Sequence, residues 1–291
     1  MRCWSSVLSS DIIGIDHLML SVSDSEEAAT VFSRMGFEIT PRGQLPGMSN
    51  RLICFENHGQ NVPNFVEMMS LDDPKTAPPS MAQALETPDR PVLMVAASAD
   101  AQITHARLDR NGLGVAPVIE GGRDWTLPDG EVIDLAFSVV LPKVGSTPIY
   151  WIACEHKTPQ HYLRETFTRH KNGSMLMGKI IAVAQDPSTA ARHYHAHWGA
   201  NLTEQNNGSV IASCGQVQLV IHTPDSFAAS FPNIDIARDE DHIVGFAVTV
   251  RNIDLVQKTL RGNSFTPNAL GEALVLDPSQ CCGCLVIFEP R

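Results

Sequence analysis

Long apolar runs and an excess of basic residues are both missing from this sequence. No run approaches the ~20 apolar residues that a membrane-spanning helix needs, so we expect no membrane segment. Acidic residues outnumber basic ones by 32 to 21, which gives a formal net charge of -11. A protein that binds nucleic acid independently of its sequence needs a basic face for the phosphates. The composition therefore argues against both a membrane protein and a general nucleic-acid binder.

Cysteine is sparse and follows no disulfide framework. The chain has seven cysteines, an odd number, and reduced thiols in the cytoplasm are the simplest explanation. Residues 1–16 also lack the apolar core and the small-residue cleavage site of a signal peptide. We therefore expect a cytoplasmic protein. The cysteines are Cys3, Cys54, Cys154, Cys214, Cys281, Cys282 and Cys284.

The sequence has the composition of a folded protein, with 43% hydrophobic and 18% charged residues. Its 291 residues are enough to bury one or two cores. No glycine-rich phosphate-binding loop and no nucleophile elbow is evident in it.

One stretch, residues 14–35, sets the pattern for the rest of the chain. Ile15–Val22 is apolar and β-prone, typical of a strand buried on both faces, and it contains His17. Asp24 follows with an oxygen that can cap a helix, before apolar residues at helical spacing. The same pattern returns later, with Asp186 at the position of Asp24. This recurrence indicates an internal duplication.

Strand-like and helix-like runs form four units along the chain, each in the order strand, helix, strand, strand, strand. The units begin near Ile15, Val92, Lys179 and Ile243. The polar segment 156–174 separates the second unit from the third. We interpret the four units as two pairs.

This plan, with a histidine in strand one and a glutamate in strand four, resembles the vicinal oxygen chelate superfamily. The superfamily includes glyoxalase I, extradiol dioxygenases and resistance proteins of the fosfomycin and bleomycin types. The chain is most similar to bacterial glyoxalase-like domain proteins, over about residues 12–175. The segments that carry the likeness are GIDHLMLSVSD, TPRGQLPGMSNRLICFENHGQNVPNFVEMM, GGRDWTLPDGEVIDLAF, PIYWIACEHKTP and HKNGS.

The resemblance implies an α+β fold of four tandem βαβββ modules that form two paired curved-sheet half-barrels. We expect residues 12–157 to form the first pair, which holds the candidate active bowl. Residues 158–175 would be a linker, and residues 176–291 a second, degenerate pair.

The resemblance also implies a metal site, because the superfamily places ligands on the first and fourth strands of two paired units. His17 and Glu67 occupy those positions in the first unit. In the second unit the first-strand position is Leu93, so one ligand is missing. Glu155, or its neighbour His156, is the candidate on the fourth strand. This set would suit a divalent ion (Zn, Mn, Fe or Ni) with positions left open for substrate.

The same residues are the candidates for catalysis, with Glu67 as a ligand and Glu155 as the third ligand or the general base. The alternative is that His17 only forms a hydrogen bond with Glu67 in the core. A register change of one residue would turn Glu155 to the other face of its strand.

The second half lacks these groups, because the position of His17 becomes Lys179 in the third unit and Gly245 in the fourth. We interpret the second bowl as a degenerate copy that supports the first by packing, or that holds an organic ligand without metal.

Candidate substrate-binding residues cluster in loops near the first bowl. Arg42, Asn50 and Arg51 lie between strands, and either arginine could bind a substrate carboxylate with both arms of its guanidinium. The alternative for the arginines is a salt bridge that fixes the loop. Trp125 either lines the pocket or belongs to the core.

Three further patterns have structural interpretations. We expect Arg123 with Asp129-Gly130 to build a hairpin turn. On a helix, His193 and His197 share a face but His195 does not, and a solvated helix end is favoured over a metal site. The CCGC run at residues 281–284 lacks a second pair of ligands at finger spacing, which favours structural or merely reactive thiols.

These observations lead to two hypotheses about function. The first is a metal-dependent enzyme of the glyoxalase/dioxygenase type, a lyase, isomerase or dioxygenase, whose small substrate chelates the metal through vicinal oxygens. The second is a metal-free protein that binds or sequesters a small molecule, as in bleomycin resistance. Because the chain carries both pairs of units, it need not dimerise, and we expect a monomer or a homodimer.

Overall fold

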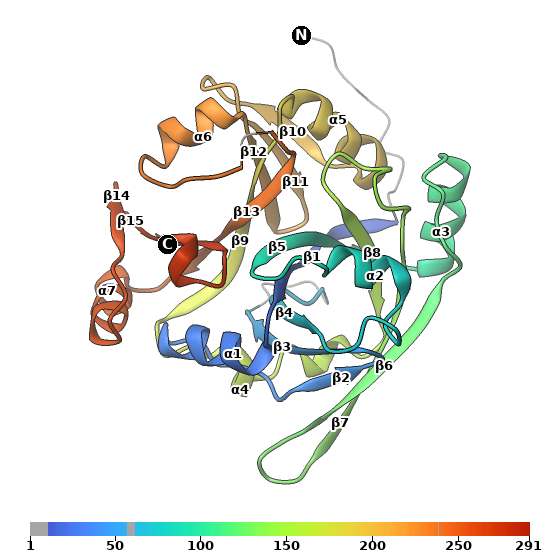
Figure 1. Cartoon of the computed structure of the whole chain (residues 1–291), viewed down its shortest axis with the longest axis horizontal. Coiled ribbons are helices and arrows are strands. Elements are labelled where there is room, and N and C mark those ends of the chain that lie inside the picture. The colour runs from blue at the N-terminus through green and yellow to red at the C-terminus, as the bar shows by residue number, and fades with distance from the viewer. Residues whose placement is uncertain (1–10, 57–61, 238) are drawn as a thin grey trace.

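The computed structural model describes residues 11–56, 62–237 and 239–291, which form two eight-stranded sheets with helices around them (Figure 1). Cys3 and most of the segment in which no signal peptide is expected lie outside the described residues. Among the described helices, none has the length and apolar character needed to cross a membrane.

The first half contains two βαβββ units joined by a short helix. The elements of the first unit are β1 (Ile12–Val22), α1 (Ser25–Arg34), β2 (Gly43–Leu45), β3 (Met48–Cys54) and β4 (Phe65–Leu71). After α2 (Pro79–Ala84), the second unit has β5 (Arg90–Ser98), α3 (Ala101–Arg110), β6 (Ile119–Thr126), β7 (Val132–Val140) and β8 (Trp151–His156).

The second half repeats this order after a short 3-10 turn, η1 (Pro159–His161), and helix α4 (Glu165–Thr168). The third unit consists of β9 (Ser174–Val183), α5 (Pro187–Trp198), β10 (Asn201–Glu204), β11 (Val210–Cys214) and β12 (Val217–His222), followed by α6 (Pro224–Ser230). The fourth consists of β13 (His242–Val250), α7 (Ile253–Gly262), β14 (Asn268–Leu270), β15 (Ala273–Leu276), the 3-10 turn η2 (Pro278–Gln280) and β16 (Leu285–Pro290).

The two sheets have the same topology. The strand order is β2-β3-β4-β1-β5-β8-β7-β6 in the first and β10-β11-β12-β9-β13-β16-β15-β14 in the second. In each sheet the first strands of two units pair antiparallel at the centre, and each pairs in parallel with the fourth strand of its own unit. The expected α+β fold of four βαβββ modules in two curved sheets is confirmed.

Each unit begins its main helix in the way that the sequence pattern predicts. The carboxylate of Asp24 accepts hydrogen bonds from the backbone N–H groups of Glu26 and Glu27, which satisfies the first turn of α1. Asp186 caps α5 in the same way. Asp100 and Asn252 cap α3 and α7. The duplication is therefore visible in the chemistry of the helix ends as well as in the strands.

Residues along the central strands alternate between a shared core and the inside of a bowl. In β1, Leu18 and Leu20 belong to a core cluster that contains residues of all four units. Met19, between them, belongs to a smaller cluster inside the first sheet. This alternation follows from the two-residue period of a strand. It gives the two halves one common core.

The two bowls differ in what fills them. The second bowl is packed with a cluster of apolar side chains that includes Phe227 and Phe231 from α6 and the segment after it. The first sheet curls until its outer strands β2 and β6 contact each other, as Figure 1 shows, and it encloses a cavity of about 310 Å³.

The segment between the halves, residues 158–175, contains η1, α4 and the start of β9. Tyr162 in this segment is fully buried, and its ring stacks 5.3 Å from that of Phe65 in β4. The segment therefore packs under the first bowl.

Candidate functional site

The cavity of the first sheet has apolar walls and one polar region. Its walls include Met19, Met48, Met69, Met81, Phe137 and Ile152. The polar and charged residues that line it are His17, Glu67, Glu120, Arg123, Cys154 and His156. A mostly apolar pocket with a few convergent polar groups is typical of a small-molecule site.

His17 and Glu67 face this cavity together, as the sequence pattern suggests. They lie on the neighbouring strands β1 and β4, at positions that point to the same face of the sheet. Nε2 of His17 lies 3.3 Å from Oε2 of Glu67, and both side chains are buried. The ring of His17 also stacks on Phe65, with 4.0 Å between the centroids.

Asp16 joins this pair because of an irregularity in β1. Ile15 pairs with Ala96 and His17 pairs with Val95, so Asp16 is an extra residue between two consecutive partners on β5. Such a bulge re-aims a side chain that regular alternation would turn to the other face. Asp16 was not among the candidates from the sequence, although a carboxylate in an apolar strand is a signal in itself.

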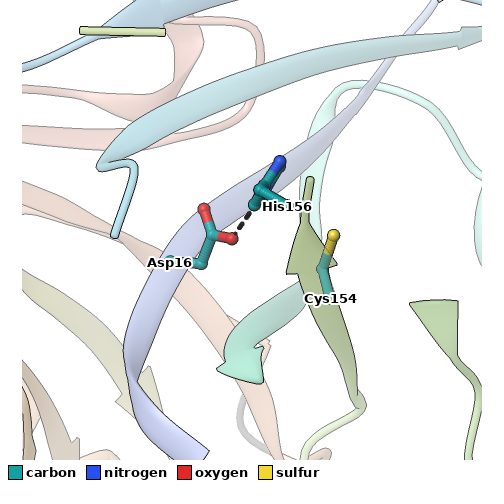
Figure 2. Close-up of side chains that lie close together, drawn as sticks. All are labelled: Asp16, Cys154 and His156. Atoms are coloured by element: carbon teal, nitrogen blue, oxygen red, sulfur yellow. Dashed lines mark ion pairs between the residues drawn. The ribbon is translucent and has the colours of Figure 1, made fainter. Parts of the chain in front are cut away.

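The carboxylate of Asp16 lies between two histidines. Its Oδ1 is 3.0 Å from Nδ1 of His17. Its Oδ2 is 2.7 Å from Nε2 of His156, the pair drawn in Figure 2. Cys154 lies next to His156 on the same face of β8, and ligand atoms of Asp16, Cys154 and His156 all lie within 4.8 Å of one another. These residues and the His17–Glu67 pair form one continuous cluster of acidic and basic groups.

Burial and charge act against each other in this cluster. Burial would raise the pKa of Asp16, but the adjacent His156 and His17 lower it to about 2. Burial would lower the pKa of His17, whereas Asp16 and Glu67 raise it to about 9. The pKa of His156 is raised in the same way, chiefly by Asp16, to about 10. For Glu67, His17 and Arg123 outweigh burial and lower the pKa.

Asn50 contacts the site through Glu67. Its side-chain amide donates a hydrogen bond to Oε1 of Glu67, and both residues are buried. Oε1 is thereby held from β3, while Oε2 faces His17. The structure thus places Asn50 behind the glutamate rather than in the wall of the cavity.

Glu155 is not brought to the cavity. It lies between Cys154 and His156 in β8, and alternation turns its side chain to the outer face. There its carboxylate accepts a hydrogen bond from the N–H of Ala101 at 2.9 Å and pairs with Lys157 at 2.5 Å. Of the two candidates on the fourth strand, His156 therefore lines the cavity and Glu155 does not.

The second unit offers no ligand at the positions equivalent to His17 and Glu67. Glu67 pairs with Met19, two residues after His17. Two residues after Leu93 is Val95, whose partner on β8 is Ile152. Both equivalent positions are therefore apolar, and His156 reaches the site from further along β8.

Arg42 and Arg51 lie outside the lining of the cavity and bind other protein groups. Arg42 donates to Oγ of Ser49 at 2.8 Å. The guanidinium of Arg51 binds the carboxylate of Glu26 with two hydrogen bonds, of 2.9 and 2.6 Å. Trp125 is fully buried in a separate cluster beneath the bowl. The two arginines thus bind other protein groups and Trp125 lies in a buried cluster, as the structural alternatives for these residues had it.

Arg123 is a residue of the cavity that the sequence analysis assigned to a turn. The turn between β6 and β7 is formed by residues 127–131, where Gly130 has a φ of 88°. Arg123 lies earlier, in β6, and its Nη2 is 3.8 Å from Oε1 of Glu67. Its side chain reaches the cavity because β6 curls round to meet β2.

The second half holds an ion pair where the first half holds its histidine. Nζ of Lys179 lies 2.7 and 2.8 Å from the two carboxylate oxygens of Glu289. At Gly245, a Cβ would come within 2.0 Å of the carbonyl oxygen of Leu285. Neither position offers a metal ligand at the centre of that sheet.

The histidines of α5 and the cysteines of the CCGC run contact other protein groups outside the cavity. His193 accepts a hydrogen bond from Nε1 of Trp151 at 3.0 Å, and its ring lies 4.4 Å from that of His197. The six described cysteines are free thiols, and Cys281 and Cys284 are buried in the common core.

His17 and Glu67 of the first bowl fit two ligands of a divalent ion. In metal sites, a ligating histidine usually gives its second nitrogen to a carboxylate, and Asp16 is so placed beside His17. The separation of 3.3 Å between His17 and Glu67 suits two ligands of one ion whose bonds are about 2.0–2.2 Å long. Nδ1 of His156 is buried and has no hydrogen-bond partner among the described residues.

The repeated topology and this histidine–glutamate pair on strands one and four define a protein of the vicinal oxygen chelate superfamily. Within that superfamily the chain belongs to the glyoxalase-like domain family, whose model matches residues 15–198. No curated protein matches the sequence.

Solved structures with the same fold have low sequence identity to this chain. A hypothetical protein from Staphylococcus aureus has 9% identity and a TM-score of 0.67, with 95% of this chain and 99% of that chain covered. A Mn(II)-bound glyoxalase from Novosphingobium aromaticivorans has 10% identity and a TM-score of 0.56, with 96% and 82% covered. A mutant of 4-hydroxymandelate synthase from Streptomyces coelicolor has 11% identity and a TM-score of 0.53, with 96% and 93% covered. At such identities the likeness shows the fold.

Proposed function

We propose that this protein is a metal-dependent enzyme of the glyoxalase/dioxygenase type that acts on a small molecule with two neighbouring oxygens. The observation that carries the proposal is the buried pair of His17 and Glu67 at the polar end of the cavity, with Asp16 behind the histidine. The glyoxalase named above is bound to Mn(II), which supports a divalent ion on this scaffold.

His17 and Glu67 are the proposed protein ligands. His156 would complete the set by moving toward them, because its ligand atom lies within 4.8 Å of those of Asp16 and Cys154. His156 takes the place of Glu155, because it is the histidine of β8 and lines the cavity, whereas Glu155 does not. Asp16 would hold both imidazoles in orientation through its two oxygens. Asn50 fixes Oε1 of Glu67, which leaves Oε2 for the ion or for a proton of the substrate. When bound, the ion would act as a Lewis acid that stabilises an oxyanion of the substrate.

The walls of the bowl would support this chemistry by excluding water. Methionine and aliphatic side chains from β1, β3, β4 and α2 line the cavity. In such an environment, charges interact more strongly than they do in water.

Metal content tests the proposal directly. We would purify wild type, His17→Ala and Glu67→Ala without a metal-affinity column and measure Zn, Mn, Fe and Ni by elemental analysis. We expect near-stoichiometric metal in wild type and loss of metal in both variants. Glu155→Gln is the matched control, because its carboxylate lies on the outer face and should leave metal content unchanged. A wild-type protein that stays metal-free after reconstitution would contradict the proposal.

Asp16→Asn extends the test to the positioning residue. Loss of a carboxylate that orients ligand histidines typically lowers metal affinity about 10–100-fold. We would measure the affinity by competition with a chromogenic chelator and compare the melting temperatures. An affinity equal to that of wild type would show that Asp16 does not orient the ligands.

A second candidate function is metal-free binding of a small molecule. It is favoured by one specific observation, that the charged groups of the site pair with one another. The apolar residues Leu93 and Ile152 at the equivalent positions of the second unit point the same way. In that case wild type would bind no metal, and ligands would be sought by thermal shift.

A further inference from the structure

Arg123 is a buried cation with few partners. Its side chain is 4% exposed. The charged group nearest to it is Oε1 of Glu67, at 3.8 Å, which is too far for a hydrogen bond. Its Nε has no hydrogen-bond partner among the described residues. A buried charge without strong partners is costly unless something compensates it.

Glu67 is poorly placed to be that partner, because its carboxylate is engaged by other groups. Asn50 donates to its Oε1, and His17 lies beside its Oε2. Two aromatic rings also lie near the guanidinium, Phe137 at 5.4 Å and Trp125 at 6.0 Å. Aromatic faces hold a cation in place but leave its N–H groups without acceptors.

The backbone around Arg123 is shaped to admit the guanidinium. A Cβ at Gly43 of β2 would lie 2.5 Å from Cδ of Arg123 and 2.9 Å from its Nε. Gly121 and Gly122, which precede Arg123 in β6, also line the cavity and add no side chain to it. The strands β2 and β6 can thus approach each other closely because Gly43 has no side chain where it faces Arg123.

We propose that Arg123 binds a carboxylate of the substrate, so that the substrate class is a monocarboxylate with an apolar body. The planar guanidinium matches a carboxylate with two parallel hydrogen bonds. The methionines and Phe137 of the same cavity would surround the apolar body. This inference rests on the proposed function for its site, and it assigns the group that selects the substrate.

Binding of matched probes tests the proposal. We would measure, by calorimetry, the affinities of phenylacetate, 4-phenylbutyrate and hexanoate, each beside its neutral amide. Wild type, Arg123→Gln and Arg123→Lys would be compared. Arg164→Gln is the control, because Arg164 is paired with Glu131 outside the cavity.

We expect wild type to bind at least one carboxylate about tenfold or more tightly than its amide, which is the effect of a charge-assisted hydrogen-bonded pair. Arg123→Gln should reduce that preference to less than about twofold, and Arg123→Lys should retain part of it because the charge remains. Arg164→Gln should bind as wild type does. Equal binding of acid and amide by wild type, an unchanged preference in Arg123→Gln, or no binding of any carboxylate would each overturn the proposal.

The same measurements separate this inference from the metal proposal. They would be made on protein stripped with chelator and on protein reconstituted with Mn(II) or Zn(II). A carboxylate preference that depends on Arg123 in stripped protein supports the inference even if the protein proves to need no metal. Stoichiometric metal without any carboxylate preference would overturn the inference and leave the metal proposal intact.

Discussion

Asp16 owes its place in the site to one extra residue in β1. In a regular strand, Asp16 and His17 would point to opposite faces, and the aspartate would enter the apolar core. The bulge brings both to the cavity, where one carboxylate contacts two histidines. The cost of burying the carboxylate is offset by these contacts, and the histidines are held in orientation.

His170 shows the opposite case, a buried histidine without a charged partner. Burial lowers its pKa to about 4. Its Nδ1 accepts a hydrogen bond from the backbone N–H of Glu38 at 2.9 Å, so the neutral ring is the form that the fold uses.

The pKa of His170 predicts a loss of stability in acid. The unfolded chain takes up a proton near the usual pKa of about 6.5, whereas the folded chain takes it up only near 4. The unfolded state therefore binds more protons between these values, and stability falls as pH decreases from 6.5 to 4, by roughly 3 kcal/mol in full.

We would measure urea unfolding at pH 7, 6 and 5 for wild type and His170→Asn, which keeps an acceptor for Glu38. The variant should lose less stability than wild type over this range. Parallel curves for the two proteins would show that His170 does not contribute.

At the scale of elements, the cavity depends on how closely the two outer strands of the first sheet approach each other. β2 is short, and β6 belongs to the long hairpin that Figure 1 shows. Asn50 and Arg123 fill the space where these strands meet, and Gly43 lies between them. The geometry of the site should therefore be sensitive to any side chain added at Gly43.

Gly43→Ala should destabilise the protein and disturb the site. The added Cβ would lie 2.4 Å from Oδ1 of Asn50 and 2.5 Å from Cδ of Arg123. Overpacking of this kind typically costs about 1–3 kcal/mol, which urea unfolding would detect. Gly178→Ala in β9 is the matched control, because its Cβ would meet Thr249 at an ordinary 3.6 Å. Equal losses in the two variants would show that the junction is not tightly packed.

At the scale of the whole molecule, the two halves share a core and backbone hydrogen bonds. The largest apolar cluster contains residues from both sheets and their helices. The side chain of Asn64 accepts from the N–H of Met177 at 2.9 Å and donates to its C=O at 3.2 Å. The N–H of Glu56 donates to the C=O of Met175 at 2.8 Å. These contacts tie the end of the first unit to β9.

We therefore expect the halves to unfold together, even when one of these ties is removed. Asn64→Ala leaves a buried N–H and C=O without partners, which should cost about 1–3 kcal/mol. Pulse labelling of thiols across a urea gradient would report both halves, through Cys54 in the first and Cys284 in the second. The two labelling midpoints should coincide in wild type and shift together in the variant. Earlier labelling of Cys284 alone would indicate that the second half unfolds by itself.

The sequence by itself was sufficient for the four units, and its resemblance to a known superfamily pointed to the first two residues of the candidate site. Strand and helix periods are local, and caps such as Asp24 and Asp186 mark where each helix begins. The resemblance to the vicinal oxygen chelate superfamily then indicated His17 and Glu67, which the structure brings within 3.3 Å of each other.

The tertiary structure decided which other side chains reach the cavity. The direction of Glu155 depends on the position of its strand to within one residue, and its neighbour His156 faces inward instead. Asp16 enters through a bulge that is visible only in the pairing of β1 with β5. Arg123 enters because the sheet curls until β6 meets β2. Each of these outcomes depends on contacts between residues far apart in the chain, which local pattern does not determine.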